Sequence, residues 1–266
     1  MISRPLYKLG MKSVYKPLLI FMAVFLLYIS TIVTMFDPDL GQALDEFSQT
    51  MPELMAMFGM TASGATLISF LSTYLYGFIM LVFPFVFTII VANSLVVRHV
   101  DRGSMAYLLA ASQTRVKVIL TQMVVYITAV FALILFGTVL GIAMSEWMFP
   151  GELDIKSFIM LNVGVLSLHF AIGGFCFLAS CITNEMRSSL FIGAGFIVLS
   201  YLLQMLANVG DKLENLKYMT FFTLFDAEGI IAGDSNAYIM MAILVLAGIL
   251  LYTLALYAFN KRDLPI

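Results

Sequence analysis

Residues 235–260 read SNAYIMMAILVLAGILLYTLALYAFN and contain no Asp, Glu, Lys or Arg. A helix needs about 20 mostly apolar residues to cross the hydrocarbon core of a bilayer, and it satisfies its own backbone hydrogen bonds in lipid. Five other stretches share this length and lack of charge. The sequence therefore predicts an all-α polytopic membrane protein with six transmembrane helices, at about residues 17–36, 66–97, 118–145, 157–184, 188–210 and 235–260.

The second span requires a choice, because residues 54–97 are uncharged and too long for one crossing. The sequence Thr-Ala-Ser-Gly at 61–64 is a poor helix interior, since glycine costs about 1 kcal/mol relative to alanine. We therefore predict an interfacial segment at 51–60 and one long span at 66–97. Pro84 falls inside this span and should kink it, because proline lacks the N–H and clashes with the preceding turn.

Basic residues are unevenly divided between the two sides of these spans. Lys and Arg next to spans favour the cytoplasm, and eleven of the fourteen lie on the side that holds both termini. The chain is thus predicted to be a single domain, 1–266, with both termini in the cytoplasm. Two termini on the same side require an even number of spans, and six satisfies this requirement. The remaining three basic residues, on the other side, are Lys156, Lys212 and Lys217.

The N-terminal segment 1–16 carries basic residues at every fourth position, which places them along one side of a helix. This pattern predicts an amphipathic interfacial helix whose basic stripe faces anionic lipid headgroups or an acidic partner. Ordinary anchoring of the first span by positive charge explains the same residues equally well. The stripe consists of Arg4, Lys8, Lys12 and Lys16.

The loop at 98–117, RHVDRGSMAYLLAASQTRVK, is the most informative one. A Gly-Ser pair precedes a short helix-compatible run with Met105, Leu108 and Leu109 on one side, and basic residues resume at Arg115. A short amphipathic helix between two spans suits docking into a groove on another protein. A plain connecting loop is the alternative.

The order Gly103-Ser104, Leu108-Leu109 and Thr114-Arg115 resembles the loop after the second span in permease subunits of type-2 ATP-binding-cassette exporters. The C-terminal YAFNKRDLPI at 257–266 is similar to the closing aromatic–x–x–Arg-Asp-Leu signature of that family. Arg98-His99 and Ser112 stand where the family usually has an acidic residue and a proline. The likeness covers nearly the whole chain with short motifs.

The resemblance implies that this chain forms the translocation path of an exporter and performs no catalysis itself. Its partners would be two copies of an ATPase subunit, which bind ATP and Mg, a second permease subunit of the same or similar kind, and membrane lipid, without nucleic acid. A bacterial cytoplasmic membrane is the expected location, and hydrophobic or amphipathic cargo such as a peptide, lipid-like molecule or drug is expected. The residues expected to contact the ATPase are Asp101, Gly103, Ser104, Met105, Leu108, Leu109 and Arg115.

Two other classes of function are less compatible with the residues. A stand-alone carrier or channel usually needs a charged residue deep in a span, and none is present; an intramembrane enzyme needs a polar catalytic set. The chain also has no phosphate-binding glycine loop and only two histidines, so no cofactor or metal site is expected.

Polar side chains inside the spans are more typical of packing than of chemistry. A neutral His169 that hydrogen-bonds between helices is favoured over a functional histidine, although an intramembrane ionisable group is always a candidate. Asn162, Gln204 and Asn208 are predicted to hydrogen-bond between helices in the same way. The clustered glycines of the third to fifth spans are predicted to allow close helix approach.

Overall fold

The computed structural model describes residues 2–37, 50–57, 66–105, 108, 114–209 and 213–262, which form helices and connecting segments without a strand. Six of its helical segments are long and apolar enough to cross a membrane, which confirms the six-span, all-α prediction. The second of them is assembled from four consecutive pieces. Those pieces are α4 (Leu67–Leu71), η2 (Ser72–Ile79), α5 (Met80–Leu95) and α6 (Val97–Asp101). The six segments are α1 (Arg4–Met35), this composite segment Leu67–Asp101, α8 (Arg115–Met148), α9 (Ile155–Ile182), α10 (Met186–Ala207) and α12 (Ser235–Lys261).

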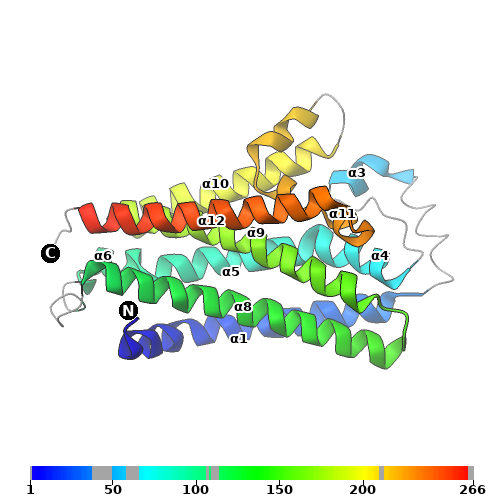
Figure 1. The fold of residues 1–266 in the computed structure, drawn as a ribbon, viewed down its shortest axis with the longest axis horizontal. Coiled ribbons are helices and arrows are strands. Elements are labelled where there is room, and N and C mark those ends of the chain that lie inside the picture. The colour runs from blue at the N-terminus through cyan, green and yellow to red at the C-terminus, as the bar shows by residue number, and fades with distance from the viewer. Residues whose placement is uncertain are drawn as a thin grey trace.

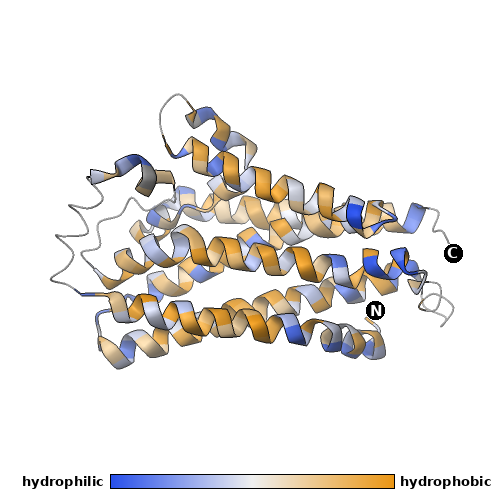
Figure 2. Ribbon diagram, turned by 180° about the vertical axis from the view of Figure 1, so that it is seen from behind, coloured by the Kyte–Doolittle hydropathy of each residue, from blue (hydrophilic) through white to orange (hydrophobic). Residues whose placement is uncertain are grey.

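The long helices run along the same axis, with α9 near the middle (Figure 1). Helix α9 packs against α5, α8, α10 and α12, and α1 packs mainly against α8. Hydrophobic residues cover the middle of the helices and hydrophilic ones gather toward the two ends, as Figure 2 shows. This distribution is that of a multi-pass membrane protein. Shorter helices α3 (Pro52–Met57), η3 (Glu214–Met219), η4 (Phe222–Leu224) and α11 (Ala227–Ala232) lie at the end away from the termini.

Both termini lie at one end of the bundle, together with the end of α6 and the start of α8 (Figure 1). The backbone N–H of Ser3 donates to the Thr121 hydroxyl (3.1 Å), which holds the start of α1 near the start of α8. The Arg115 guanidinium donates to the backbone carbonyl of Arg262 (2.7 Å), which holds the end of α12 at the same place. We call this the terminal end; the prediction that it faces the cytoplasm comes from the excess of basic residues there.

The N-terminal segment differs from the prediction in one respect. The sequence predicts a separate interfacial helix at 1–16 before a span at 17–36, whereas α1 is one helix from Arg4 to Met35 with Pro17 inside it. Leu6, Gly10 and Val14 are buried and extend the apolar stripe of the span. A Cβ at Gly10 would lie 2.8 Å from the Val125 side chain of α8, so the segment packs closely against a neighbouring helix rather than apart from the bundle. The predicted basic residues are all exposed on the opposite face: Arg4, Lys8, Lys12 and Lys16.

The second span is irregular around Pro84, as expected from the missing N–H. An eight-residue π-helix, η2, precedes α5, and Pro84 lies within α5. In an α-helix the residue at 84 would donate to the carbonyl of Met80, and proline cannot. His169 of α9 lies against this carbonyl instead, with 3.2 Å between its Nε2 and the Met80 oxygen. Since a carbonyl only accepts, Nε2 carries the proton, which agrees with the predicted neutral histidine between helices.

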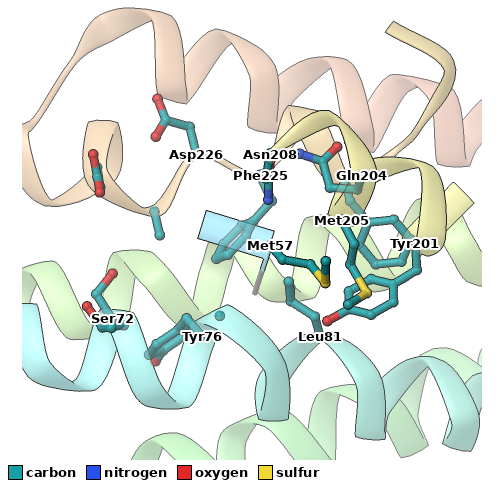
Figure 3. A pocket seen from close by; sticks show the side chains of 15 residues that line it. Met57, Ser72, Tyr76, Leu81, Tyr201, Gln204, Met205, Asn208, Phe225 and Asp226 are labelled. Carbon is teal, nitrogen blue, oxygen red and sulfur yellow. Dashed lines mark hydrogen bonds between the residues drawn. The ribbon is translucent and has the colours of Figure 1, made fainter. Parts of the chain in front are cut away.

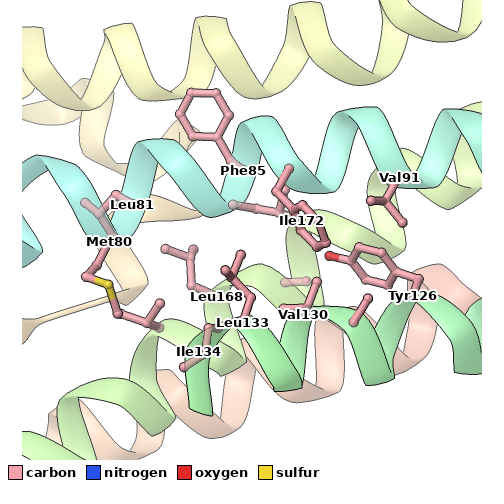
Figure 4. Packing of buried hydrophobic residues seen from close by; sticks show 14 of the residues in the cluster. Met80, Leu81, Phe85, Val91, Tyr126, Val130, Leu133, Ile134, Leu168 and Ile172 are labelled. Atoms are coloured by element: carbon pink, nitrogen blue, oxygen red, sulfur yellow. The ribbon is translucent and has the colours of Figure 1, made fainter. Parts of the chain in front are cut away.

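The core between α5, α8 and α9 is apolar and closely packed (Figure 4). Tyr126 lies within it, 1% exposed, among residues such as Val130 and Ile172. Its hydroxyl donates to the His169 carbonyl (2.9 Å) and pairs with the Thr88 hydroxyl (2.9 Å), so its polar atom is satisfied in the apolar interior.

Several glycines fit where a side chain would not, as predicted for close helix packing. A Cβ at Gly173 would lie 2.3 Å from Tyr126, and one at Gly174 would lie 2.9 Å from Leu251 of α12. The partner position on α12, Gly248, was not among the predicted packing glycines; a Cβ there would lie 2.4 Å from Phe170. Gly195 is different, since nothing lies within 4 Å of its Cβ position.

The arrangement of the ends predicts the result of cysteine labelling in intact cells. A membrane-impermeant maleimide should label cysteines placed at Glu152 or Tyr218, which are exposed at the end away from the termini, and should not label one at Arg102. The native Cys176 and Cys181 are buried and should contribute little signal. Labelling at Arg102 without permeabilisation would reverse the orientation derived from the basic residues.

Candidate functional site

The predicted contact loop begins with a tight turn at the terminal end. Helix α6 ends at Asp101, and Gly103 follows with φ of +69°, a left-handed conformation that glycine adopts without strain. Its N–H donates to the carbonyl of Val100 (3.0 Å), a typical helix C-terminus. The Ser104 hydroxyl lies 3.0 Å from Nδ1 of His99. The Gly-Ser pair therefore has a local structural role: it ends the helix that completes the second span.

Two apolar residues of this loop pack against the chain's own hydrophobic core. The Met105 side chain is 3% exposed and belongs to the core cluster, and Leu108 is partly buried against that cluster. The Met105 side chain therefore has little surface left in the isolated chain, and its contact with a partner stays a prediction. Leu109 lies outside the described residues. Among the described residues at the end of α6 and just after it, Asp101, Arg102 and Gly103 are exposed.

Arg115 has an intramolecular partner that sequence reasoning did not predict. Thr114 caps α8 by accepting the N–H of Lys117 (3.3 Å), which places Arg115 at the first turn. The Arg115 guanidinium then donates to the carbonyl of Arg262, just after α12. An arginine close to the last carbonyls of a helix is favourable, because these groups otherwise lack partners.

Arg262 continues this connection to a third helix. Its guanidinium donates to the carbonyl of Cys181 (2.5 Å) and to the side-chain oxygen of Asn184 at the end of α9. Burial lowers the pKa of Arg262 from its ordinary value, yet an arginine stays charged in proteins. We call the connected residues Arg115, Arg262 and Cys181 the arginine clamp; it joins the start of α8 to the ends of α12 and α9.

A cavity of about 270 Å³ lies at the opposite end of the bundle, between η2, α10 and α11 (Figure 3). Its walls include Ser72, Thr73 and Tyr76 from the π-helix, and Tyr201 and Gln204 from α10. Aromatic and apolar side chains complete it, with Asp226 and Glu228 at one side. No basic side chain lines the cavity among the described residues. The second and fifth spans thus enclose a partly polar, acidic hollow.

Hydrogen bonds fix the wall that α10 shares with the short helices. The Gln204 side-chain oxygen accepts from the hydroxyls of Thr220 (2.8 Å) and Thr223 (2.5 Å), and its amide nitrogen donates to Asn208 (3.1 Å). These bonds hold the segment with η3 and η4 against the end of α10. The predicted hydrogen bond between helices is confirmed for Gln204, which bonds to Thr223 of η4, whereas the partner of Asn208 is Gln204 of the preceding turn. Both residues line the cavity.

The floor of the cavity is tied to α9. The Asn162 amide donates to the Tyr76 hydroxyl (2.6 Å), which agrees with the predicted hydrogen bond between helices. The Asp226 carboxylate caps α11 by accepting the N–H of Gly229 (2.9 Å). The Tyr201 hydroxyl is buried and has no hydrogen-bond partner among the described residues. No group of three or more metal-ligating side chains occurs in the described part of the chain.

Comparison with known proteins places the chain in a family. It belongs to the family described as "Protein of unknown function (DUF2705)", whose model matches residues 50–265. No curated protein matches the chain.

Proposed function

We propose that this chain is the membrane-spanning subunit of an ATP-driven exporter of the type-2 ATP-binding-cassette class. In this proposal two such subunits form the translocation path in a bacterial cytoplasmic membrane, and two copies of a separate ATPase bind at the terminal end. The chain carries no part of the ATP-hydrolysing machinery. Its task is to convert movement of the ATPase into rearrangement of the spans.

The observation that carries the proposal is the meeting of two motif segments that are distant in the sequence. The loop after the second span and the C-terminal Lys-Arg-Asp-Leu segment supply the resemblance, and Arg115 of the first bonds to Arg262 of the second. Gly103 and Thr114 each have a local structural role in ending or starting a helix. Residues that resemble family motifs thus build one site at the end where an ATPase would bind.

The arginine clamp gives this site a path to the spans. A force on the loop would reach α8 directly, because Arg115 is in its first turn. The hydrogen bonds of Arg262 would pass it to α12 and α9, and α9 packs against four of the other spans. Chains of hydrogen bonds and packed helices of this kind can carry coupling between two distant sites.

Charge reversal in the exposed part of the loop tests the partner. Asp101→Arg combined with Arg102→Glu should lower retention of the ATPase on the detergent-solubilised chain by roughly tenfold, because the reversed charges would face like charges on the partner, and like charges at an interface repel. Both residues are exposed, so insertion and stability should stay unchanged. Glu152→Lys, an exposed reversal at the other end, is the matched control. Undiminished retention and ATP hydrolysis in the loop variant would count against this site as the ATPase contact.

A further inference from the structure

We propose that the exposed side of α1 binds an anionic phospholipid in the leaflet at the terminal end. Its phosphate is held by Lys12 and Lys16, and its acyl chains lie along Leu19 and Leu26. The spacing of the basic residues alone leaves two partners open for the stripe, anionic headgroups or an acidic partner. The continuous helix favours the headgroups and separates Lys12 and Lys16 from the two basic residues nearer the terminus. Lipid binding of this kind requires neither an ATPase nor a cargo.

The continuity of α1 sets the depth of its basic residues in the bilayer. Residues 17–35 carry no charge and cover about 28 Å at 1.5 Å per residue, close to the thickness of the hydrocarbon core of about 30 Å. Lys16 therefore lies at the edge of the core, and Lys12 lies about 6 Å beyond it, within a headgroup layer of roughly 5–7 Å. Lys8 and Arg4 follow at about 12 and 18 Å from the same edge.

Packing against α8 keeps the N-terminal part of α1 in line with the span. A helix that lies on the bilayer surface would have to turn away from the span near Pro17, yet α1 is helical on both sides of this proline. The N–H of Ser3 donates to the Thr121 hydroxyl, and a Cβ at Gly10 would lie 2.8 Å from the Val125 side chain. Turning the segment onto the surface would break both contacts with α8.

Lys12 and Lys16 lie on the side of α1 that faces lipid. They precede Leu19, Ala23 and Leu26 at steps of four, three, four and three residues, a spacing that keeps all five on one side of a helix. All five side chains are exposed, so the other described helices leave this side uncovered. A phospholipid whose acyl chains pack along the leucines has its phosphate at the level of the two lysines. An acidic protein could reach Lys16 only by displacing these headgroups.

The charge of this segment selects an anionic lipid over a neutral one. Residues 2–36 contain four basic side chains and no Asp or Glu, so α1 itself gives the lysines no counter-charge. One lysine near an anionic bilayer surface favours association by about fivefold. Tyr15, the exposed neighbour of Lys16, is of the type that is enriched at the membrane–water interface. An anionic headgroup at this depth therefore meets both charge and an interfacial aromatic residue.

Quenching of a single tryptophan by brominated lipids measures which lipids contact this surface. The reporter is the full-length chain with Trp147→Phe, which removes its one tryptophan, and Leu19→Trp. In phosphatidylcholine bilayers, brominated phosphatidylglycerol should be favoured over brominated phosphatidylcholine at position 19 by roughly fivefold or more. Lys12→Gln combined with Lys16→Gln should abolish this preference, whereas Lys12→Arg with Lys16→Arg should keep it. Glutamine is as good a helix former as lysine, so α1 should remain folded.

Two controls locate the site. Arg4→Gln removes a charge that lies about 10 Å outside the headgroup layer, one Debye length at 0.1 M salt, and should change the preference by less than about twofold. The native Trp147, 78% exposed near the end of α8 away from the termini, reports on the other leaflet and should show no preference for phosphatidylglycerol.

Four results would overturn the lipid site. Absence of a preference at position 19 would leave an acidic protein surface as the partner of the stripe. A preference that survives in the double glutamine variant would exclude the two lysines as its cause. Loss of the preference in the Arg4→Gln variant would mean that the segment lies flat on the bilayer, and an equal preference at Trp147 would mean that the lipid is not bound at this site. None of these results bears on the ATPase contact, which retention measures separately.

Discussion

Replacing Gly173 with alanine should destabilise the folded protein by about 3 kcal/mol, at the upper end of the cost of overpacking a core. The new Cβ would lie 2.3 Å from the Tyr126 ring and hydroxyl, well inside contact distance. Tyr126 cannot move aside without loss, because hydrogen bonds to Thr88 and to the His169 carbonyl hold it in the buried core. The clash therefore reaches α5, α8 and α9 together.

The measurement is unfolding in mixed micelles, followed by gel filtration of the remaining folded protein. Gly195→Ala is the matched control, since it makes the same change in a helix where nothing lies within 4 Å. That control should be neutral or slightly stabilising, because alanine favours a helix by up to about 1 kcal/mol over glycine. Equal stability of the Gly173 variant and the wild type would show that Tyr126 does not pack against α9 in this way.

The six spans could be predicted because their signal is local. Absence of charge over about 20 residues is readable along the chain, and it located every crossing to within a few residues, apart from the start of the first. That start was missed because Leu6, Gly10 and Val14 are buried by tertiary packing, which for Gly10 is against Val125 of α8, more than a hundred residues away. The basic residues indicated a helix face correctly but not what its opposite face contacts.

The arginine clamp and the cavity could not be predicted for a related reason. Arg262 donates to a carbonyl 81 residues earlier in the chain, and backbone carbonyls have no sequence signature. The cavity depends on the short helices after α10 folding back onto the second span. Gln204 and Asn208 were visible as polar residues in a span, but their placement at this hollow required the fold. Polar residues late in the fifth span therefore do not by themselves predict that the segment after α10 folds back onto them.

His169→Leu should destabilise the protein by about 2 kcal/mol, because it leaves the Met80 carbonyl buried without a donor. The carbonyl depends on the histidine because Pro84 cannot supply the ordinary helical hydrogen bond to it. His169→Gln, which keeps an N–H donor of similar reach, should recover much of the loss. These variants are compared with the wild type by the same mixed-micelle unfolding.

Combining His169→Leu with Pro84→Ala distinguishes this account from a simple loss of packing. Alanine at 84 restores an N–H that can donate to Met80. Pro84→Ala should therefore stabilise the His169→Leu variant more than it stabilises the wild type, where His169 already donates to that carbonyl. The double-mutant cycle should give a coupling energy of about 1–2 kcal/mol in favour of the double variant. Additive effects would mean that the histidine stabilises the bundle through its volume alone, and that Pro84 and His169 are energetically independent.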